Sequence, residues 1–192
     1  MIRKALECIR GELNLYLDPA NAPDSADDVV LLANIAHAES AKLADDKVLM
    51  SLINIEEENT LKNGPFYKKT DPTSILKHNP AVHLNLYVLF AINAVNDTKY
   101  FNALIYLSKI IAFFQRKNTF QASNTPTLDP KIEKIIVDLF SPNFEQLNHL
   151  WGMLGGKYMP SVAYKIRMIT IDDAQAEPSS IITEIDLITT KI

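Results

Sequence analysis

Cysteine is nearly absent from the sequence. The 192 residues include a single cysteine, Cys8, so no disulfide can form within the chain. A reducing, cytoplasmic folding compartment fits that composition. The first 17 residues are interrupted by charged and amide side chains, and they lack the apolar core of roughly 7–15 residues that a signal peptide needs. We therefore expect a protein that is synthesised, folded and assembled in the cytoplasm.

Long apolar runs are absent as well. A membrane-spanning helix needs about 18 or more consecutive apolar residues. The nearest candidate, residues 100–114, is broken by Asn102, Ser108 and Lys109. We therefore expect no direct insertion into a membrane.

The chain also has no excess of positive charge. Its 19 Lys and Arg residues stand against 23 Asp and Glu residues, which gives a net charge of −4, and the basic residues are scattered. Proteins that follow a phosphate backbone carry a basic stripe or patch, so we expect no direct nucleic-acid binding. The apolar fraction of 47% and the charged fraction of 22% are typical of a globular protein, and the length suits a single domain.

Glycine is scarce, and three of the five glycines lie close to the only tryptophan in "HLWGMLGGKYMPSVAYKIRMITID", residues 149–172. Its "GMLGGK" is similar to a phosphate-binding loop, which requires Gly, four residues, and then Gly-Lys-Ser/Thr. Here Trp151 stands where the first glycine should be, and Tyr158 stands where a small hydroxyl residue should hold Mg²⁺. The glycines also follow a predicted helix and precede a predicted strand, which is the reverse of the order in a phosphate loop. The pattern instead predicts a turn that ends a helix, with Gly155 in the left-handed conformation, and no cofactor.

Other catalytic and metal-binding patterns fail too. The four histidines do not show the clustered spacing of metal ligands. Cys8 lies among apolar residues of the first predicted helix, which is typical of a buried, inert thiol. We therefore expect no catalytic, cofactor-binding or metal-binding residues and no enzyme activity. The alternative is a small enzyme whose site assembles from scattered residues such as His83, Glu56 and Asp172.

Hydrophobic periodicity predicts the secondary structure. We expect helices over 2–17, over 99–117, and from 141 or 143 to 154. We expect strands over 29–36, 48–59, 82–92, around 120, over 131–140 and over 161–171, although the short run 29–36 suits a helix equally. The three X-Pro steps within 61–80 predict a long loop. The helix over 99–117 is apolar on nearly all sides, which indicates burial over most of its circumference.

The irregular spacing of these elements shows no repeated strand–helix–strand rhythm. It predicts an α/β chain of the α+β type, with a mixed, mostly antiparallel sheet flanked by helices. We expect one domain over residues 1–172 and a C-terminal extension over 173–192.

Three segments are candidate interfaces. Phe66 and Tyr67 lie beside two lysines in the predicted loop, a combination typical of an interface anchor, although a loop folded back on its own domain is equally compatible. Lys165 and Arg167 share the polar face of a predicted strand and either meet an acidic surface or are ordinary solvated positions. The C-terminal "IITEIDLITTKI" alternates and predicts a strand that pairs with another chain. Its apolar positions include Ile181, Ile185 and Leu187.

The stretch "LFSPNFEQLNHLWGMLGGKYMPSVAYKIRMITID" resembles the signature region of the tail-terminator (cap) proteins of contractile injection systems, which are phage-tail-like particles. The shared pattern is a helix ending in Leu-Trp, a glycine turn, and Pro-Ser-x-x-Tyr leading into a basic strand. The similarity covers residues 1–172. We expect the tryptophan and the tyrosine of this pattern to pack together across the corner between helix and strand. The matching residues are Trp151, Gly155, Gly156, Pro160, Ser161 and Tyr164.

The resemblance implies a sheet flanked by helices, as in phage tail terminators, and a non-enzymatic structural protein. It further implies a homo-oligomeric, six-membered ring that closes the inner tube at the end distal to the baseplate and contacts the last ring of sheath protein. Another tail component, such as a neck adaptor or a tube-initiation protein, is the alternative. Such a ring needs heterologous interfaces, in which one patch binds a different patch on the next subunit. The sequence leaves open whether the particle is released or membrane-anchored.

Overall fold

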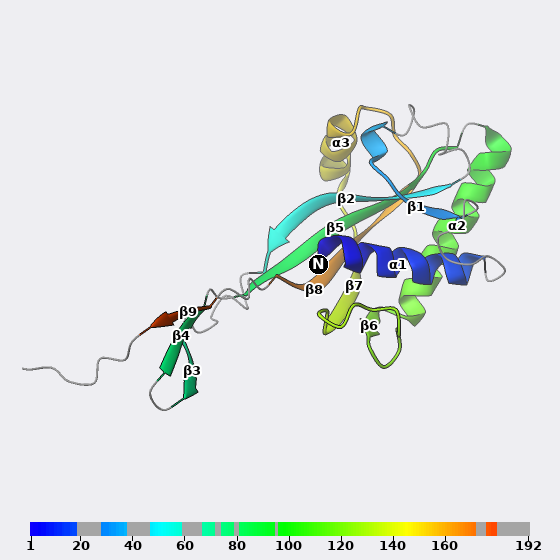
Figure 1. The fold of residues 1–192 in the computed structure, drawn as a ribbon. Coiled ribbons are helices and arrows are strands. Elements are labelled where there is room, and N and C mark those ends of the chain that lie inside the picture. Colours follow the sequence, from blue (N-terminus) through cyan, green and yellow to red (C-terminus); the bar gives the residue numbers. More distant parts are fainter. Residues whose placement is uncertain are drawn as a thin grey trace, which may run out of the picture.

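The computed structural model describes residues 1–18, 28–37, 47–58, 67–71, 74–78, 81–94, 96–171 and 176–179. These residues form a six-stranded sheet with helices on both faces and, apart from it, a three-stranded sheet (Figure 1). In chain order the elements are α1 (Ile2–Leu17), β1 (Val30–Leu32), the 3-10 helix η1 (Ile35–His37), β2 (Val48–Glu57), β3 (Tyr67–Asp71), β4 (Ser74–His78), β5 (Val82–Ile92), α2 (Asp97–Arg116), β6 (Thr119–Gln121), β7 (Lys134–Phe140), α3 (Phe144–Met153), β8 (Ser161–Ile171) and β9 (Ala176–Ser179).

The large sheet has the strand order β1-β2-β5-β8-β7-β6, and the small sheet has the order β3-β4-β9. Only the edge pair β1–β2 is parallel, and every other described pair is antiparallel. The predicted fold class, a mixed and mostly antiparallel sheet flanked by helices, is confirmed.

One face of the large sheet packs against α1 and α2 and carries the main core. Leu86, Val88 and Phe90 alternate along β5 and are buried on this face, as the sequence predicts. Tyr164 of β8 lies against Phe90 and against Phe114 of α2, with ring centroids 5.9 and 4.5 Å apart. This aromatic cluster joins the middle of the sheet to α2.

α1 lies on the same face and is anchored to the sheet edge. Its predicted apolar stripe is confirmed, because Leu6, Ile9 and Leu13 are buried. Asn14 is buried as well, and its side chain donates to the carbonyl of Val30 at 3.1 Å and accepts from the Val30 N–H at 2.8 Å. One amide side chain therefore satisfies both backbone groups of Val30 on the outer side of β1.

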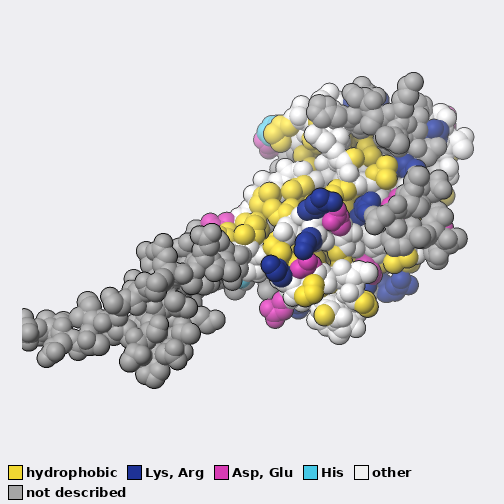
Figure 2. Space-filling view, viewed as in Figure 1, with side chains coloured by type: hydrophobic (Ala, Val, Ile, Leu, Met, Phe, Trp, Pro, Cys, Tyr) yellow, Lys and Arg dark blue, Asp and Glu magenta, His cyan; other side chains and the backbone are white. Residues whose placement is uncertain are grey.

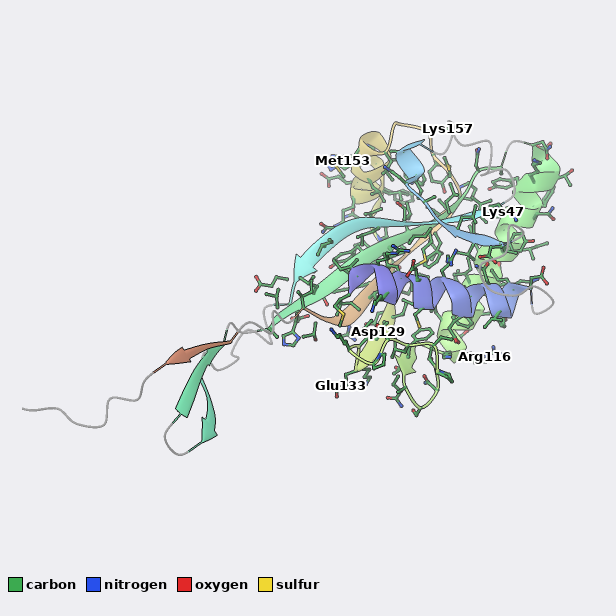
Figure 3. The ribbon with its side chains drawn as sticks, viewed as in Figure 1. Lys47, Arg116, Asp129, Glu133, Met153 and Lys157 are labelled. Atoms are coloured by element: carbon green, nitrogen blue, oxygen red, sulfur yellow. The ribbon has the colours of Figure 1, made fainter. Side chains whose placement is uncertain are left out.

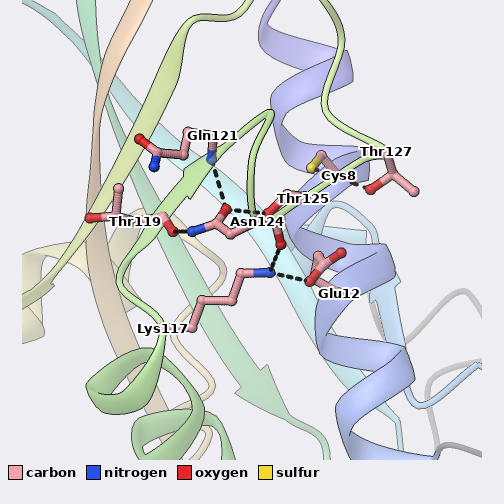
Figure 4. Close-up of polar contacts among 8 residues, drawn as sticks. All are labelled: Cys8, Glu12, Lys117, Thr119, Gln121, Asn124, Thr125 and Thr127. Carbon is pink, nitrogen blue, oxygen red and sulfur yellow. Dashed lines mark hydrogen bonds and ion pairs between the residues drawn. The ribbon is translucent and has the colours of Figure 1, made fainter.

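A polar cluster joins α1 to the end of α2 and the turn after β6 (Figure 4). Lys117 donates to Glu12 Oε2 at 2.6 Å and to the carbonyl of Asn124 at 3.0 Å. The Asn124 side chain in turn bonds to backbone groups of β6. Cys8 is buried nearby with its Sγ 4.0 Å from Thr127 Oγ1, and burial raises the pKa of its thiol. The prediction that Cys8 is a buried thiol is confirmed.

The opposite face of the large sheet is covered by α3, and Trp151 is buried there with residues of β2, β5 and β8. The expected packing of Trp151 on Tyr164 is therefore wrong. Side chains alternate along β8, so Ala163 faces α3 while Tyr164 faces α1 and α2. The aromatic partner of Trp151 is Tyr158, with ring centroids 5.6 Å apart.

Two further expectations need correction. The predicted loop over 61–80 contains β3 and β4, which pair as a hairpin, and its three prolines at positions 65, 72 and 80 all lie outside these strands. The run 29–36 holds only a three-residue strand followed by η1. After β8, residues Ala176–Ser179 form β9, which pairs with β4 of the same chain and for which no strand was predicted. The domain boundary near residue 172 stays a prediction, and residues 61–66 lie outside the described residues.

The fourth correction concerns α2. It forms almost where predicted, but only one stripe is buried, made by Ala103, Leu107, Ile110, Phe113 and Phe114. Large apolar side chains on the rest of the helix are exposed. The prediction that α2 is buried over most of its circumference is wrong for a single copy of the chain.

Candidate interaction surfaces

The corner between α3 and β8 is built as the sequence predicts. Asn143 caps α3 by accepting from the N–H of Gln146, and Gln146 accepts in return from the N–H of Asn143, which forms a capping box. Gly155 and Gly156 follow the helix with φ of 107° and 79°. The N–H of Gly156 donates to the carbonyl of Trp151 at 2.7 Å. This bond satisfies one of the carbonyl groups left open at the end of the helix, so the glycine pair acts as a helix terminator.

The remaining motif residues fix the start of β8 against the sheet. The carbonyl of Pro160 accepts from the N–H of Ile92 at 3.2 Å, and Ser161 lies opposite Ala91 in the sheet. Trp151 packs beneath this corner, and its Nε1 is buried without a hydrogen-bond partner among the residues described. These contacts indicate that the motif around Trp151 organises the domain.

Lys165 and Arg167 share one face of β8, as predicted, and each meets a carboxylate of the same chain. Lys165 Nζ lies 3.4 Å from Glu56 Oε2 and 5.5 Å from the ring centroid of Tyr87. The Tyr87 hydroxyl donates to the same carboxylate at 2.8 Å, and this bond, together with Lys165, holds the pKa of Glu56 below its ordinary value. Arg167 pairs with Asp138 at 2.6 Å. An acidic surface on another molecule would have to compete with these pairs, and that contact stays a prediction.

Two of the three residues named for the enzyme alternative lie in the part of the chain that the structure describes, and both are engaged in contacts with other side chains. His83 Nδ1 lies 3.1 Å from Thr170 Oγ1, and Glu56 is engaged by Tyr87 and Lys165. Asp172 lies outside the described residues. Among the residues that the structure describes, no three His, Cys, Asp or Glu side chains are grouped to hold a metal ion. No helix in the same residues is long and apolar enough to cross a membrane.

The candidate interface in the small sheet is only partly described. Tyr67 begins β3 and lies opposite Lys77 of β4. Phe66 lies outside the described residues, as do all three apolar positions of the C-terminal segment, Ile181, Ile185 and Leu187. In the described part of the small sheet, β9 is an edge strand. That these positions form an interface stays a prediction.

A second apolar stripe of α2 is a surface that the sequence reading missed. It consists of Phe101, Leu104, Ile105 and Ile111, of which Phe101 is the most exposed at 66%. We refer to these four residues as the outer stripe. Leu104 and Ile105 lie three and four positions after Phe101, and Ile111 lies seven positions after Leu104, so the four residues share one side of the helix. A shallow groove along it is lined by Tyr16, Phe101, Leu104, Ile105, Ser108, Lys109 and Ala112. The sequence carries two interleaved apolar stripes, and hydrophobic periodicity alone does not distinguish these from a helix that is buried on nearly all sides.

A second exposed apolar surface lies at the end of the large sheet where β5 begins and β8 ends. Ile55 lies opposite Leu86, and Val82 lies opposite Ile171, so these side chains share the face that packs against α1 and α2. Ile55, Val82 and Ile171 are exposed, and Leu84 beside them is partly buried. We refer to Ile55, Val82, Leu84 and Ile171 as the sheet-end patch. Figure 2 shows apolar side chains gathered where the body narrows toward the small sheet.

The fold is similar to two solved structures. One is the sheath/tube terminator of the extracellular contractile injection system PVC in its extended state, with a TM-score of 0.60 and 13% identity over 100% of this chain and 64% of that chain. The other is the tube-terminating cap of the anti-feeding prophage, with a TM-score of 0.57 and 13% identity over 96% of this chain and 60% of that chain. The chain therefore spans less than two thirds of the length of either protein.

Sequence comparison gives the family directly. No curated protein matches the chain in sequence. A family model described as the Pvc16 N-terminal domain matches residues 5–184, which is nearly the whole chain. The chain belongs to the Pvc16 N-terminal domain family.

Proposed function

We propose that this chain is a non-enzymatic structural protein that terminates the inner tube of a contractile injection system at the end distal to the baseplate. The main support is that this chain, a member of the Pvc16 N-terminal domain family, shares its fold with a sheath/tube terminator and with a tube-terminating cap over 96% or more of its length. Both of those proteins are described as terminating a tube, and one is described as terminating the sheath as well. The tube contact therefore has the stronger support, and the sheath contact is the second part of the proposal.

The proposed assembly is a ring of six copies, made in the cytoplasm and incorporated into the particle. A ring requires each copy to present two different surfaces to its neighbours. The outer stripe of α2 and the sheet-end patch are two such surfaces. Residues 180–192 are proposed to add as a strand to a neighbouring copy or to the sheath protein, in keeping with their alternating sequence.

The test uses tubes assembled in vitro from the inner tube protein, with the baseplate end marked by the protein that initiates the tube. The full chain carries a C-terminal tag for gold labelling and is added before further tube protein. We expect gold at the unmarked end of each tube and no further elongation there. The control is the same experiment with heat-denatured chain. Gold at the marked end would indicate an initiation protein, and gold along the tube wall or nowhere would overturn the proposal.

A further inference from the structure

We propose that the outer stripe of α2 in one copy packs on the sheet-end patch of the next copy. Each copy would then supply the helix that covers the open end of its neighbour's sheet. This inference deepens the proposed ring and rests on it for its biological setting, although the contact itself can be measured on the purified chain.

α2 is suited to lie between two layers. Its buried stripe packs on its own sheet, and the outer stripe presents a continuous row of apolar side chains on the other side of the helix. A helix on the surface of a monomeric protein is normally polar on the side that faces away from the core. An apolar row of this kind on an otherwise ordinary helix marks a docking surface.

The sheet-end patch is suited to receive a helix. Its side chains come from three adjacent strands, β2, β5 and β8, and extend the same face whose central part is covered by α1 and α2. The N-terminus of α1 lies beside this part of the sheet, so α1 does not extend over its end (Figure 1). An apolar sheet face is stabilised by a packed helix, and the outer stripe is an exposed helix surface of the right kind.

The charges around the two surfaces have opposite signs. The groove on α2 is flanked by Lys109 and Arg116, whose cationic groups lie over tyrosine rings of the same copy, 5.9 and 4.9 Å from the ring centroids. Neither has a carboxylate partner among the residues described here. Arg116 lies at the C-terminal end of α2 (Figure 3). The sheet-end patch adjoins the acidic run 56–58, and Glu57 lies opposite Leu84 on the same face.

The two surfaces also lie at opposite ends of the body. In Figure 1, α2 lies at the right end of the large sheet, while the sheet-end patch lies at the left, toward β3, β4 and β9. A contact between them is heterologous, because it joins different patches and leaves both copies with one patch unused. Repetition of that contact gives a closed ring or an open filament, and the closed ring is the form that the proposed cap requires.

The decisive experiment is disulfide trapping between two differently substituted chains. Cys8 is replaced by Ala in all variants, because it is the only native cysteine. One chain carries Ile105→Cys and the other carries Ile55→Cys, at sites that are 53% and 47% exposed, so neither change should disturb folding. We expect mild oxidation of the mixture to give the mixed dimer in large excess over either homodimer, and a chain carrying both cysteines to give a ladder that ends at the ring.

A charge-reversal pair gives a second measurement that does not depend on oxidation. Lys109→Glu and Glu57→Lys should each weaken self-association several-fold, measured by sedimentation velocity. Mixing the two variants should recover a mixed dimer, since the reversed charges again attract each other. Phe144→Asp is the matched control: Phe144 is 91% exposed but lies on α3, on the opposite face of the sheet, so its replacement should leave association unchanged.

Three results would overturn the inference. The first is a homodimer of the Ile105→Cys chain alone, which would indicate two-fold packing of α2 on α2. The second is a crosslink from Ile105→Cys to tube protein in place of a second copy. The third is the absence of a mixed dimer both in solution and on tube ends. The proposed function can fail separately. Trapped rings that do not bind tube ends would retain the contact and refute the cap, whereas capped tubes without the trapped contact would retain the cap and refute the contact.

Discussion

Tyr164 provides a quantitative test of the aromatic core because it places an ionisable phenol in a buried position. It is 2% exposed and lies against the rings of Phe90 and Phe114. Burial raises the pKa of Tyr164 from its ordinary value of 10.0 to about 12, since a phenolate in this apolar setting is poorly solvated. The change we propose is Tyr164→Phe, which keeps the ring and removes the ionisable group.

The expected effect follows from the two pKa values. Below pH 10 the Tyr164 phenol is neutral in both the folded and the unfolded chain, so its contribution to the free energy of unfolding is fully present. Between pH 10 and about 12 the unfolded chain releases this proton while the folded chain retains it, so the unfolded state is favoured as pH rises. A shift of about two pKa units corresponds to about 2–3 kcal/mol of stability lost across that window. The Tyr164→Phe chain cannot lose this contribution.

The assay is urea denaturation of both chains at closely spaced pH values from about 8 to 12, and the quantity compared is the difference in free energy of unfolding. Other tyrosines and the lysines titrate in both chains, so their effects cancel in the difference. The wild-type chain should become less stable relative to Tyr164→Phe by about 2–3 kcal/mol, with most of the change above pH 10. Tyr100→Phe, at an exposed ring on α2, is the control. Parallel pH profiles for the wild-type and Tyr164→Phe chains would refute the placement of Tyr164 in an apolar core.

Two further predictions test the helix terminator and the edge strand by thermal denaturation. Gly155→Ala and Gly156→Ala should each cost about 1–2 kcal/mol because of their positive φ. Gly152→Ala, inside α3 with open space around it, should be neutral or stabilising, and equal costs at all three sites would contradict the turn geometry. Asn14→Leu should cost about 2–3 kcal/mol, because both backbone groups of Val30 lose their partner. An unchanged melting temperature would contradict that anchoring role.

Local patterns were sufficient wherever a residue's structure depends on its sequence neighbours. The alternation in β5 and β8 gave both strands and their faces, and the observed start of α3 at the Asn143 cap is one of the two that the sequence predicts. The glycine pair after α3 was also assigned correctly, because a left-handed turn restricts the residue type at a single position. These elements include most of the motif residues in 149–172.

Long-range pairing could not be obtained in the same way. β4 pairs with β9, about 100 residues later in the chain, and no local pattern specifies that partner. Trp151 and Tyr164 are close in sequence, and the predicted strand over 161–171 has the observed bounds of β8. The face of the sheet that α3 covers depends on packing between distant elements, and α3 lies on the face opposite Tyr164.

The misprediction for α2 has a different origin and says more about function. Its composition indicated burial on nearly all sides, and the isolated chain leaves the outer stripe exposed. An apolar stripe that faces solvent gains nothing from the hydrophobic effect in a monomer, and it adds a risk of aggregation. If the next copy covers this stripe with its sheet-end patch, the helix is buried on both sides in the ring. The composition of α2 then fits the assembled protein, and the exposure seen in one copy marks the surface on which assembly depends.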